Sequence, residues 1–476
     1  MYDSWSGHFN EVREAVERFE KMEYRGQEFF FDVHSIENIF DFYIDKLQFN
    51  KAERIIEIGL RQHPEASVLR VKQAIIFIEN GKLSKATALL ENLLQIEKSN
   101  SEVYLNLGYV YLRNDQNEKA KAVFNEGFKY AFGNDTEVLL DVILYLNQFH
   151  EYQAAIDILE KRKNLFWSNE NLLFELAYAY DKVEEDQKAF NTYQQVLDIN
   201  PWSDNAWYNS GITLVKMGDL RGADEAFDFC LAINPEHSQA YFNKGNSLAQ
   251  QNRYQEALDS YLECISYDIF QSRCHHYIAD CWNQLGNSTM AGKYFDLATR
   301  IDPMDIDAWE SFARFYMEQQ DPENCRAVIA MAMREKEMMH DSELGMFHHI
   351  KAQSYVLEEE WELSKKFFVK AILSNRRDLR HIIALFKLNK ALNPAYNIEL
   401  FVDEYGDKFI ETVSFQYILA AYHILITEDL EQATELLNGA ISSAPGYLDD
   451  LLEAFPGLNP VIKESPELND FIEQNK

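Results

Sequence analysis

A ladder of alanines recurs almost every 34 residues, and this regularity constrains the fold more than any other feature of the sequence. All steps from Ala52 to Cys325 are 34 or 35 residues, whereas the step from Cys325 to Ser364 is 39. Self-similarity at a fixed period is typical of repeat architectures, in which each unit contacts only its neighbours. The ladder positions are Ala52, Ala86, Ala120, Ala155, Ala189, Ala223, Ala257, Ala291, Cys325, Ser364 and Ala433.

Other positions keep the same period and indicate two helices in each repeat. Large apolar residues recur four residues after and nine residues before each ladder position, and small residues recur twelve before it in many repeats. In the sixth repeat, Gly211 and Leu214 lie on one face of a first helix, and Ala223 and Phe227 lie on one face of a second. Pro235 ends that helix. One such hairpin cannot bury both of its faces, so neighbouring hairpins must stack.

This spacing resembles the tetratricopeptide repeat family. Its pattern of aromatic, small, large, small, aromatic and proline is matched by Trp207, Gly211, Leu214, Ala223, Phe227 and Pro235. The resemblance implies an all-α protein, an α-solenoid that forms a right-handed superhelix of about twelve helix-turn-helix repeats, with the first helices lining a concave groove. It covers Val33 to about Tyr447 and is weakest at Leu379, where Asn389 and Ile398 depart from the pattern. The repeats begin near Val33, Ser67, Ser101, Thr136, Glu170, Asp204, Ser238, Ser272, Ile306, Gly345, Leu379 and Ser414.

The pattern predicts five segments along the chain. Residues 1–32 form an N-terminal capping region, 33–333 a front array of nine repeats, and 334–344 an extended linker or hinge. Residues 345–447 form a rear array of three repeats with a degenerate middle one, and 448–476 a C-terminal capping helix and tail. Solenoids need caps because their end repeats otherwise expose an apolar face. Amphipathic stripes suit both ends: Phe9, Val12, Val16 and Phe19, and Leu448, Leu451, Leu452 and Phe455.

Charge restricts the partners. The 476 residues include 45 Lys and Arg against 78 Asp and Glu, a formal net charge of −33. Such a field repels nucleic acid and anionic membrane surfaces, so neither is expected as a partner. The first residues lack the apolar core of a signal peptide, and no run approaches the roughly 18 apolar residues of a membrane span. We therefore expect a cytoplasmic protein, whose oligomeric state the sequence does not indicate.

No catalytic signature is present. The chain has no GxGxxG, GxxxxGK[ST], HExxH or GxSxG motif. His276 and Asp280 are spaced to share a metal, but Cys274 and Cys281 lie near the packing side of the same helix, where thiols behave as small hydrophobes. The five cysteines have no CxxC spacing. We expect no enzymatic activity, no metal and no cofactor.

The predicted binding residues lie on an inner stripe of each first helix, at its second, fifth, sixth, ninth and twelfth or thirteenth positions, which do not pack within the repeat. In the central repeats this stripe is rich in aromatic and amide side chains. An amide both donates and accepts, so it can bond an extended peptide backbone without demanding a sequence. Aromatic rings supply contact area at small entropic cost. The predicted groove consists of Phe174, Tyr178, Tyr208, Asn209, Phe242, Asn243, Asn246, Arg273, His276 and Tyr277.

The sequence thus predicts a protein-interaction scaffold that binds a peptide or protein along this groove. Two alternatives stay open. The array could instead be a structural component that docks into a larger assembly through its ends or its convex face. The stripe could also be structural, with its rings packed on the next repeat and its amides solvated.

Overall fold

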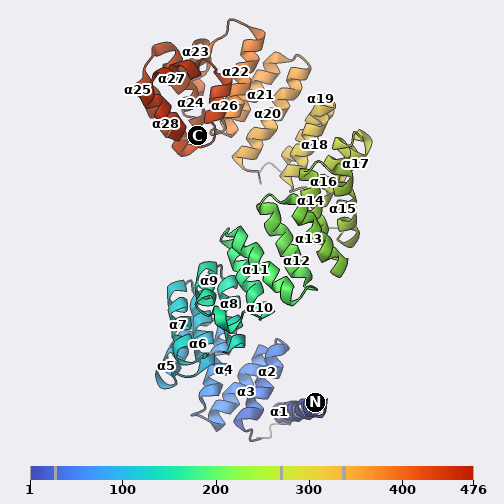
Figure 1. Ribbon diagram of the computed structural model, residues 1–476, viewed down its shortest axis with the longest axis vertical. Coiled ribbons are helices and arrows are strands. Elements are labelled where there is room, and N and C mark those ends of the chain that lie inside the picture. Colours follow the sequence, from blue (N-terminus) through green and yellow to red (C-terminus); the bar gives the residue numbers. More distant parts are fainter. Residues whose placement is uncertain (1, 26–28, 134, 269–271, 335–338, 475–476) are drawn as a thin grey trace. The chain divides into compact units, whose positions relative to one another are not determined.

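The computed structural model describes all residues except 1, 26–28, 134, 269–271, 335–338 and 475–476 (Figure 1). Every regular element in this part of the chain is a helix, and the helices follow one another as hairpins. The prediction of an all-α solenoid is therefore confirmed. The chain divides into two compact units, Met1–Pro235 and Glu236–Lys476, named unit 1 and unit 2 below.

Unit 1 consists of one N-terminal helix and six hairpins. Val16 and Phe19 of the N-terminal helix are buried in one apolar cluster with the first hairpin, so they cover its apolar side. The helices are α1 (Tyr2–Arg25), α2 (Val33–Asp45), α3 (Phe49–Gln62), α4 (Ser67–Glu79), α5 (Leu83–Ile96), α6 (Ser101–Arg113), α7 (Asn117–Tyr130), α8 (Thr136–Gln148), α9 (Tyr152–Glu160), the 3-10 turn η1 (Lys163–Leu165), α10 (Glu170–Lys182), α11 (Asp186–Ile199), α12 (Asp204–Lys216) and α13 (Leu220–Ile233).

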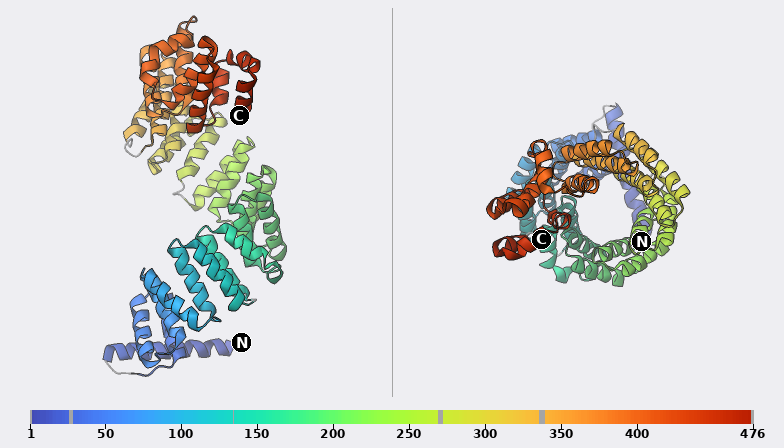
Figure 2. Two further views of the ribbon diagram at one scale, coloured as in Figure 1. Left: turned by 90° about the vertical axis from the view of Figure 1, so that its left-hand side faces the viewer. Right: turned by 90° about the horizontal axis from the view of Figure 1, so that it is seen from above.

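Unit 2 continues with six more hairpins and ends in three short helices. Leu448, Leu451 and Phe455, from the first short helix and the residue after it, are buried against the last repeats. The helices are α14 (Ser238–Gln250), α15 (Tyr254–Tyr267), α16 (Ser272–Gln284), α17 (Ser288–Ile301), α18 (Ile306–Glu318), α19 (Pro322–Ala332), α20 (Asp341–Leu357), α21 (Trp361–Ser374), α22 (Leu379–Leu392), α23 (Ile398–Phe409), α24 (Val413–Tyr422), the π-helix η3 (His423–Thr427), α25 (Leu430–Ser443), α26 (Leu448–Ala454), α27 (Leu458–Glu464) and α28 (Pro466–Gln474). Figure 2 shows the paired helices stacked within each unit.

Ten of the twelve first helices begin at the residue that the ladder predicts. Helix α24 begins one residue early, and α20 begins at Asp341 rather than Gly345. The Glu343 carboxylate explains the earlier start of α20, because it accepts a hydrogen bond from the His340 backbone N–H at 2.7 Å and so caps the first turn. Of the expected linker 334–344, residues 335–338 lie outside the described residues, and its role as a hinge stays a prediction.

Within a hairpin, a small residue on the first helix faces a large ring on the second. A Cβ atom added to Gly211 would lie 2.6 Å from Phe227, and one added to Gly245 would lie 2.5 Å from Tyr261. Side-chain carbons do not approach this closely, so the rings fill the space that the glycines leave. The ladder residue Ala223 is fully buried beside them. Small and large positions therefore keep the same period because each requires the other.

Hydrogen bonds then join consecutive repeats. The hydroxyl of Tyr111 in α6 donates to the Glu91 carboxylate in α5 at 2.5 Å. Tyr180 in α10 donates in the same way to Glu160 in α9. Both tyrosines are almost fully buried, yet each hydroxyl has an acceptor, as buried polar groups require. The same residue position thus fills the core and fixes the register between neighbours.

The ladder can be tested by enlarging one of its members. Ala223→Leu should cost about 1–3 kcal/mol of stability, because the added atoms meet a close-packed helix crossing. The matched control is Ala232→Leu in the same helix α13, where the side chain is exposed and the cost should be close to zero. Thermal and urea unfolding of the two variants measure the difference. Equal stabilities would show that the ladder is not the packing seam.

Candidate functional site

In unit 1, the inner stripes of three consecutive first helices line a solvent-open cavity of about 310 Å³. Helix α8 contributes Leu140 and Leu144, and α10 contributes the predicted site residue Phe174. Leu144 is 43% exposed and Phe174 is half-buried, so the cavity has an apolar wall that solvent can reach. Polar groups from α10, α12 and the turn before α12 complete the lining: Glu170, Asn171, Glu175, Ser203 and Asn205.

Phe174 also meets Tyr193 of its own hairpin edge-on, with ring centroids 5.7 Å apart. The other three predicted residues of unit 1 are half-buried and likewise have intramolecular contacts. The ring of Tyr178 packs edge-on against Tyr152, with centroids 6.1 Å apart, and the ring of Tyr208 lies 6.2 Å from Phe227. Asn209 donates its side-chain N–H to the backbone oxygen of Asn205 at 2.8 Å. One of the two N–H donors of this amide is thus engaged within its own helix.

In unit 2, the predicted aromatic residues form one cluster of rings. Tyr277 in α16 stacks on Tyr261 in α15, with centroids 5.6 Å apart and planes 17° from parallel. Phe242 in α14 meets Tyr277 edge-on at 5.6 Å, so it reaches the next first helix. Asn246 accepts a hydrogen bond from the Tyr261 hydroxyl at 2.7 Å. The rings and this amide thus hold one another in fixed orientations.

The remaining predicted residues of unit 2 differ in exposure. Arg273 is exposed, Asn243 is half-buried, and His276 is only 7% exposed. The His276 Nε2 atom lies 2.8 Å from the Ser311 hydroxyl of α18 and 3.2 Å from the Asp280 carboxylate. Burial acts to lower the pKa of His276, but the hydrogen bond to Asp280 and nearby carboxylates outweigh it, so this pKa is raised. His276 therefore fixes α16 to α18 rather than projecting into solvent.

The cavity of unit 1 is acidic. Burial raises the pKa of Glu175, and a hydrogen bond from Asn147 partly opposes this effect. On α8, burial and repulsion from Glu137 and Asp135 raise the pKa of Asp141. Among the described residues, no lysine or arginine forms an ion pair with either carboxylate. Charge on this part of the stripe is therefore uncompensated.

Contacts between first helices hold the cavity's walls in place. Asn147 of α8 donates to the Glu175 carboxylate of α10 at 2.7 Å. The Lys216 ammonium of α12 lies 2.8 Å from the Asp181 carboxylate of α10. Because three neighbouring first helices are tied together, the inner stripe is largely pre-formed before any partner arrives.

Four of the ten predicted residues thus lie in unit 1 and six in unit 2. The predicted groove begins at Phe174 in the fifth repeat and therefore omits Leu140 and Leu144, which belong to the fourth. Their signal was available, because they occupy the fifth and ninth positions, as Phe174 and Tyr178 do one repeat later. Glu175 occupies the sixth position of the stripe but is not among the predicted binding residues, since a half-buried acid cannot be told from a solvated one by spacing.

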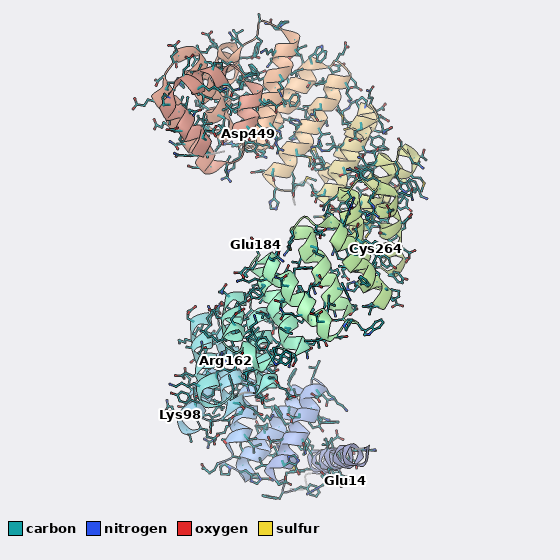
Figure 3. All side chains as sticks on the ribbon, viewed as in Figure 1. Glu14, Lys98, Arg162, Glu184, Cys264 and Asp449 are labelled. Carbon is teal, nitrogen blue, oxygen red and sulfur yellow. The ribbon has the colours of Figure 1, made fainter. Side chains whose placement is uncertain are left out.

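Among the described residues, no group of three or more His, Cys, Asp or Glu side chains could hold a metal ion. In the same part of the chain, no helix is both long and apolar enough to cross a membrane. Cys264 of α15, labelled in Figure 3, is buried with its sulfur 3.0 Å from that of Cys274.

Comparison with known proteins identifies the repeats. Residues 77–139 and 208–266 each match a sequence profile described as tetratricopeptide repeat. No curated protein matches the chain.

Parts of the chain are also similar to solved structures. One is a MamA protein, with 20% identity and a TM-score of 0.34, covering 36% of this chain and 93% of that one. Another is YrrB, described as a TPR protein with an unusual peptide-binding site. It has 19% identity and a TM-score of 0.35, and the match covers 39% of this chain and 95% of that one. A third is a tetratricopeptide repeat protein from Parabacteroides merdae. It has 18% identity and a TM-score of 0.41, and the match covers 54% of this chain and 99% of that one. At these identities and TM-scores the likeness carries no argument about function.

The buried carboxylate predicts a dependence of stability on pH. Because the pKa of Glu175 is raised from 4.5 in the folded chain, the folded state binds more protons than the unfolded state as the pH rises above 4.5. The contribution of Glu175 to stability is therefore lost as the pH rises from 4.5 through the raised pKa of the folded state. Glu175→Gln should melt at a higher temperature than the wild type at pH 8, and the gap should shrink towards pH 5.

The control is Glu225→Gln on α13, where the side chain is exposed. It should show neither the gain at pH 8 nor the trend. A Glu175→Gln variant that melts below the wild type at pH 8 would mean that the ionised carboxylate stabilises the fold.

Proposed function

We propose that this chain, which belongs to the tetratricopeptide repeat family, is a scaffold without catalytic activity that binds a peptide or protein partner along the inner stripes of its first helices. The observation that carries the proposal is the cavity of unit 1, because it lies on the stripe and includes the predicted Phe174. Its volume of about 310 Å³ is at the lower end of the usual range for ligand sites. A cavity of this size suits one or two side chains of a peptide.

The aromatic cluster of unit 2 supports the same function by a different route. The rings of Phe242 and Tyr277 have orientations set by contacts with each other and with the fully buried Tyr261. Rings held in this way lose little freedom on binding, so most of their contact energy is available to a partner. Phe242 and Tyr277 are also only half-buried, so each still has surface to offer.

One observation favours the alternative, a structural component of a larger assembly that docks through other surfaces. Exposed apolar side chains recur at the last position of second helices in both units. Single exposed apolar residues need no explanation, but a recurring position can mark a contact surface. These residues are Ile96, Tyr130, Ile199, Tyr267 and Ile301, with exposed fractions between 37% and 72%.

Site-specific crosslinking separates the two functions. A photoreactive phenylalanine analogue placed at Tyr208 or Phe242 should crosslink a partner in native cells if the inner stripe binds it. The same analogue at the exposed aromatic residues Tyr130 and Tyr267 of the second helices provides the matched comparison. Crosslinks found only at Tyr130 and Tyr267 would support docking through the outer surface and refute the proposed function.

Substitutions then measure how much the stripe contributes. Tyr208→Ala, Phe242→Ala and Asn243→Ala should each weaken binding of the crosslinked partner, the two aromatic changes by about fivefold to thirtyfold. Titration calorimetry gives the affinity, and circular dichroism checks the fold. Tyr130→Ala should leave the affinity unchanged. If every loss of binding is matched by a loss of helicity, these residues act as core and not as a binding surface.

A further inference from the structure

The cavity of unit 1 combines an apolar wall with acceptor groups. Leu140, Leu144 and Phe174 form the apolar part, and Glu170 and Glu175 contribute carboxylates. Glu170 already accepts a hydrogen bond from the Asn200 side chain at 2.8 Å. Burial is the largest influence on the pKa of Glu175 and raises it.

A second buried group beside Glu175 has an unused acceptor. The Asn147 side chain is only 6% exposed and donates through Nδ2 to a Glu175 carboxylate oxygen at 2.7 Å. Its Oδ1 atom is buried and accepts no hydrogen bond among the described residues. Leaving such an acceptor unsatisfied costs about 1–3 kcal/mol, so a structure keeps one only where something offsets the cost.

Positive charge is what this cavity lacks. The neighbouring lysines of unit 1, Lys182 and Lys216, both lie within ion-pair distance of Asp181 rather than of a cavity carboxylate. Asp141, one position along the same stripe from Leu140, adds a further carboxylate without a cation partner among the described residues. The local field therefore favours a cation over a neutral or acidic group.

We infer that this cavity receives a lysine or arginine side chain of the partner, with the adjacent apolar residue of the partner lying against Leu140, Leu144 and Phe174. The inference rests on the proposed function and names the chemistry of the occupant. A long basic side chain covers an apolar wall with its aliphatic stem while its charged end bonds an acid. A guanidinium also offers several N–H donors in a planar fork, which suits the carboxylates of the lining.

The test uses two fluorescent, capped twelve-residue peptides, one alternating leucine and arginine and the other alternating leucine and citrulline, which has the shape of arginine without its charge. The full-length protein should bind the arginine peptide more tightly in fluorescence anisotropy at physiological salt. Glu175→Gln should weaken the arginine peptide about tenfold or more and leave the citrulline peptide unchanged, because it removes only the charge. Leu144→Ala should weaken both peptides, since it removes shared apolar contact.

Two controls separate a built site from a generally acidic surface. Glu225→Gln removes one exposed charge from α13 and should change the affinity for the arginine peptide by less than twofold. Folding is followed by thermal melting, in which Glu175→Gln should be at least as stable as the wild type. A variant that is more stable yet binds less is typical of a functional residue rather than a structural one.

Several results would overturn the inference. Equal effects of Glu175→Gln and Glu225→Gln would show that basic peptides bind the whole acidic surface. Equal affinity for the arginine and citrulline peptides would show that charge is not recognised. If Tyr208 crosslinks a partner whose affinity Glu175→Gln does not change, the basic occupant is wrong and the proposed function stands. Crosslinks confined to Tyr130 and Tyr267 would instead remove the proposed function itself.

Discussion

The close approach of two helices in a hairpin, with a small residue on one opposite a large ring on the other, is the contact on which the rest of this structure depends. Phe227 occupies the space that a Cβ on Gly211 would need, and Tyr261 does the same at Gly245. The buried ladder alanines serve the same seam on the second helix. Because interiors are packed to crystal density, neither partner of such a pair can change size alone. The pair therefore repeats as a unit, and the repeat length follows from it.

Because this seam uses one side of each first helix, the opposite side is available for contacts with the next repeat or with a partner. Residues outside this seam form the inner stripe and meet the stripe of the next repeat. The expectation that they do not pack within the hairpin is wrong for several rings, since Tyr208 contacts Phe227 and Phe242 contacts Tyr261 of their own second helices. Some of these meetings are structural, as where His276 bonds Ser311. Others leave surface accessible, as at Leu144 beside Phe174. A solenoid can thus vary this stripe repeat by repeat without disturbing its core, because each repeat contacts only its neighbours.

At the unit 1 cavity, keeping an accessible acidic wall conflicts with the stability of the folded chain. Glu175 is half-buried beside Asn147, whose own buried Oδ1 atom accepts no hydrogen bond among the described residues. Such a combination destabilises the folded chain slightly, and a protein selected for stability alone would replace the acid with an amide or an apolar residue. Its presence on a solvent-accessible wall is what makes a partner with a basic side chain the natural occupant.

The sequence by itself determined the helical hairpins, their number and, in ten of twelve cases, the residue at which the first helix begins. It could do so because hairpin packing is local: Gly211, Ala223 and Phe227 lie within 17 positions of one another and repeat with the period. Tertiary structure decided which stripe residues are accessible. Spacing cannot show that one N–H donor of Asn209 is engaged within its own helix, that His276 is buried against α18, or that side chains from three helices line an open cavity at Phe174. Those outcomes depend on side-chain directions and on contacts between residues more than 30 positions apart. For such residues the periodic pattern specifies that two of them are neighbours, but not which parts of their side chains stay exposed to solvent.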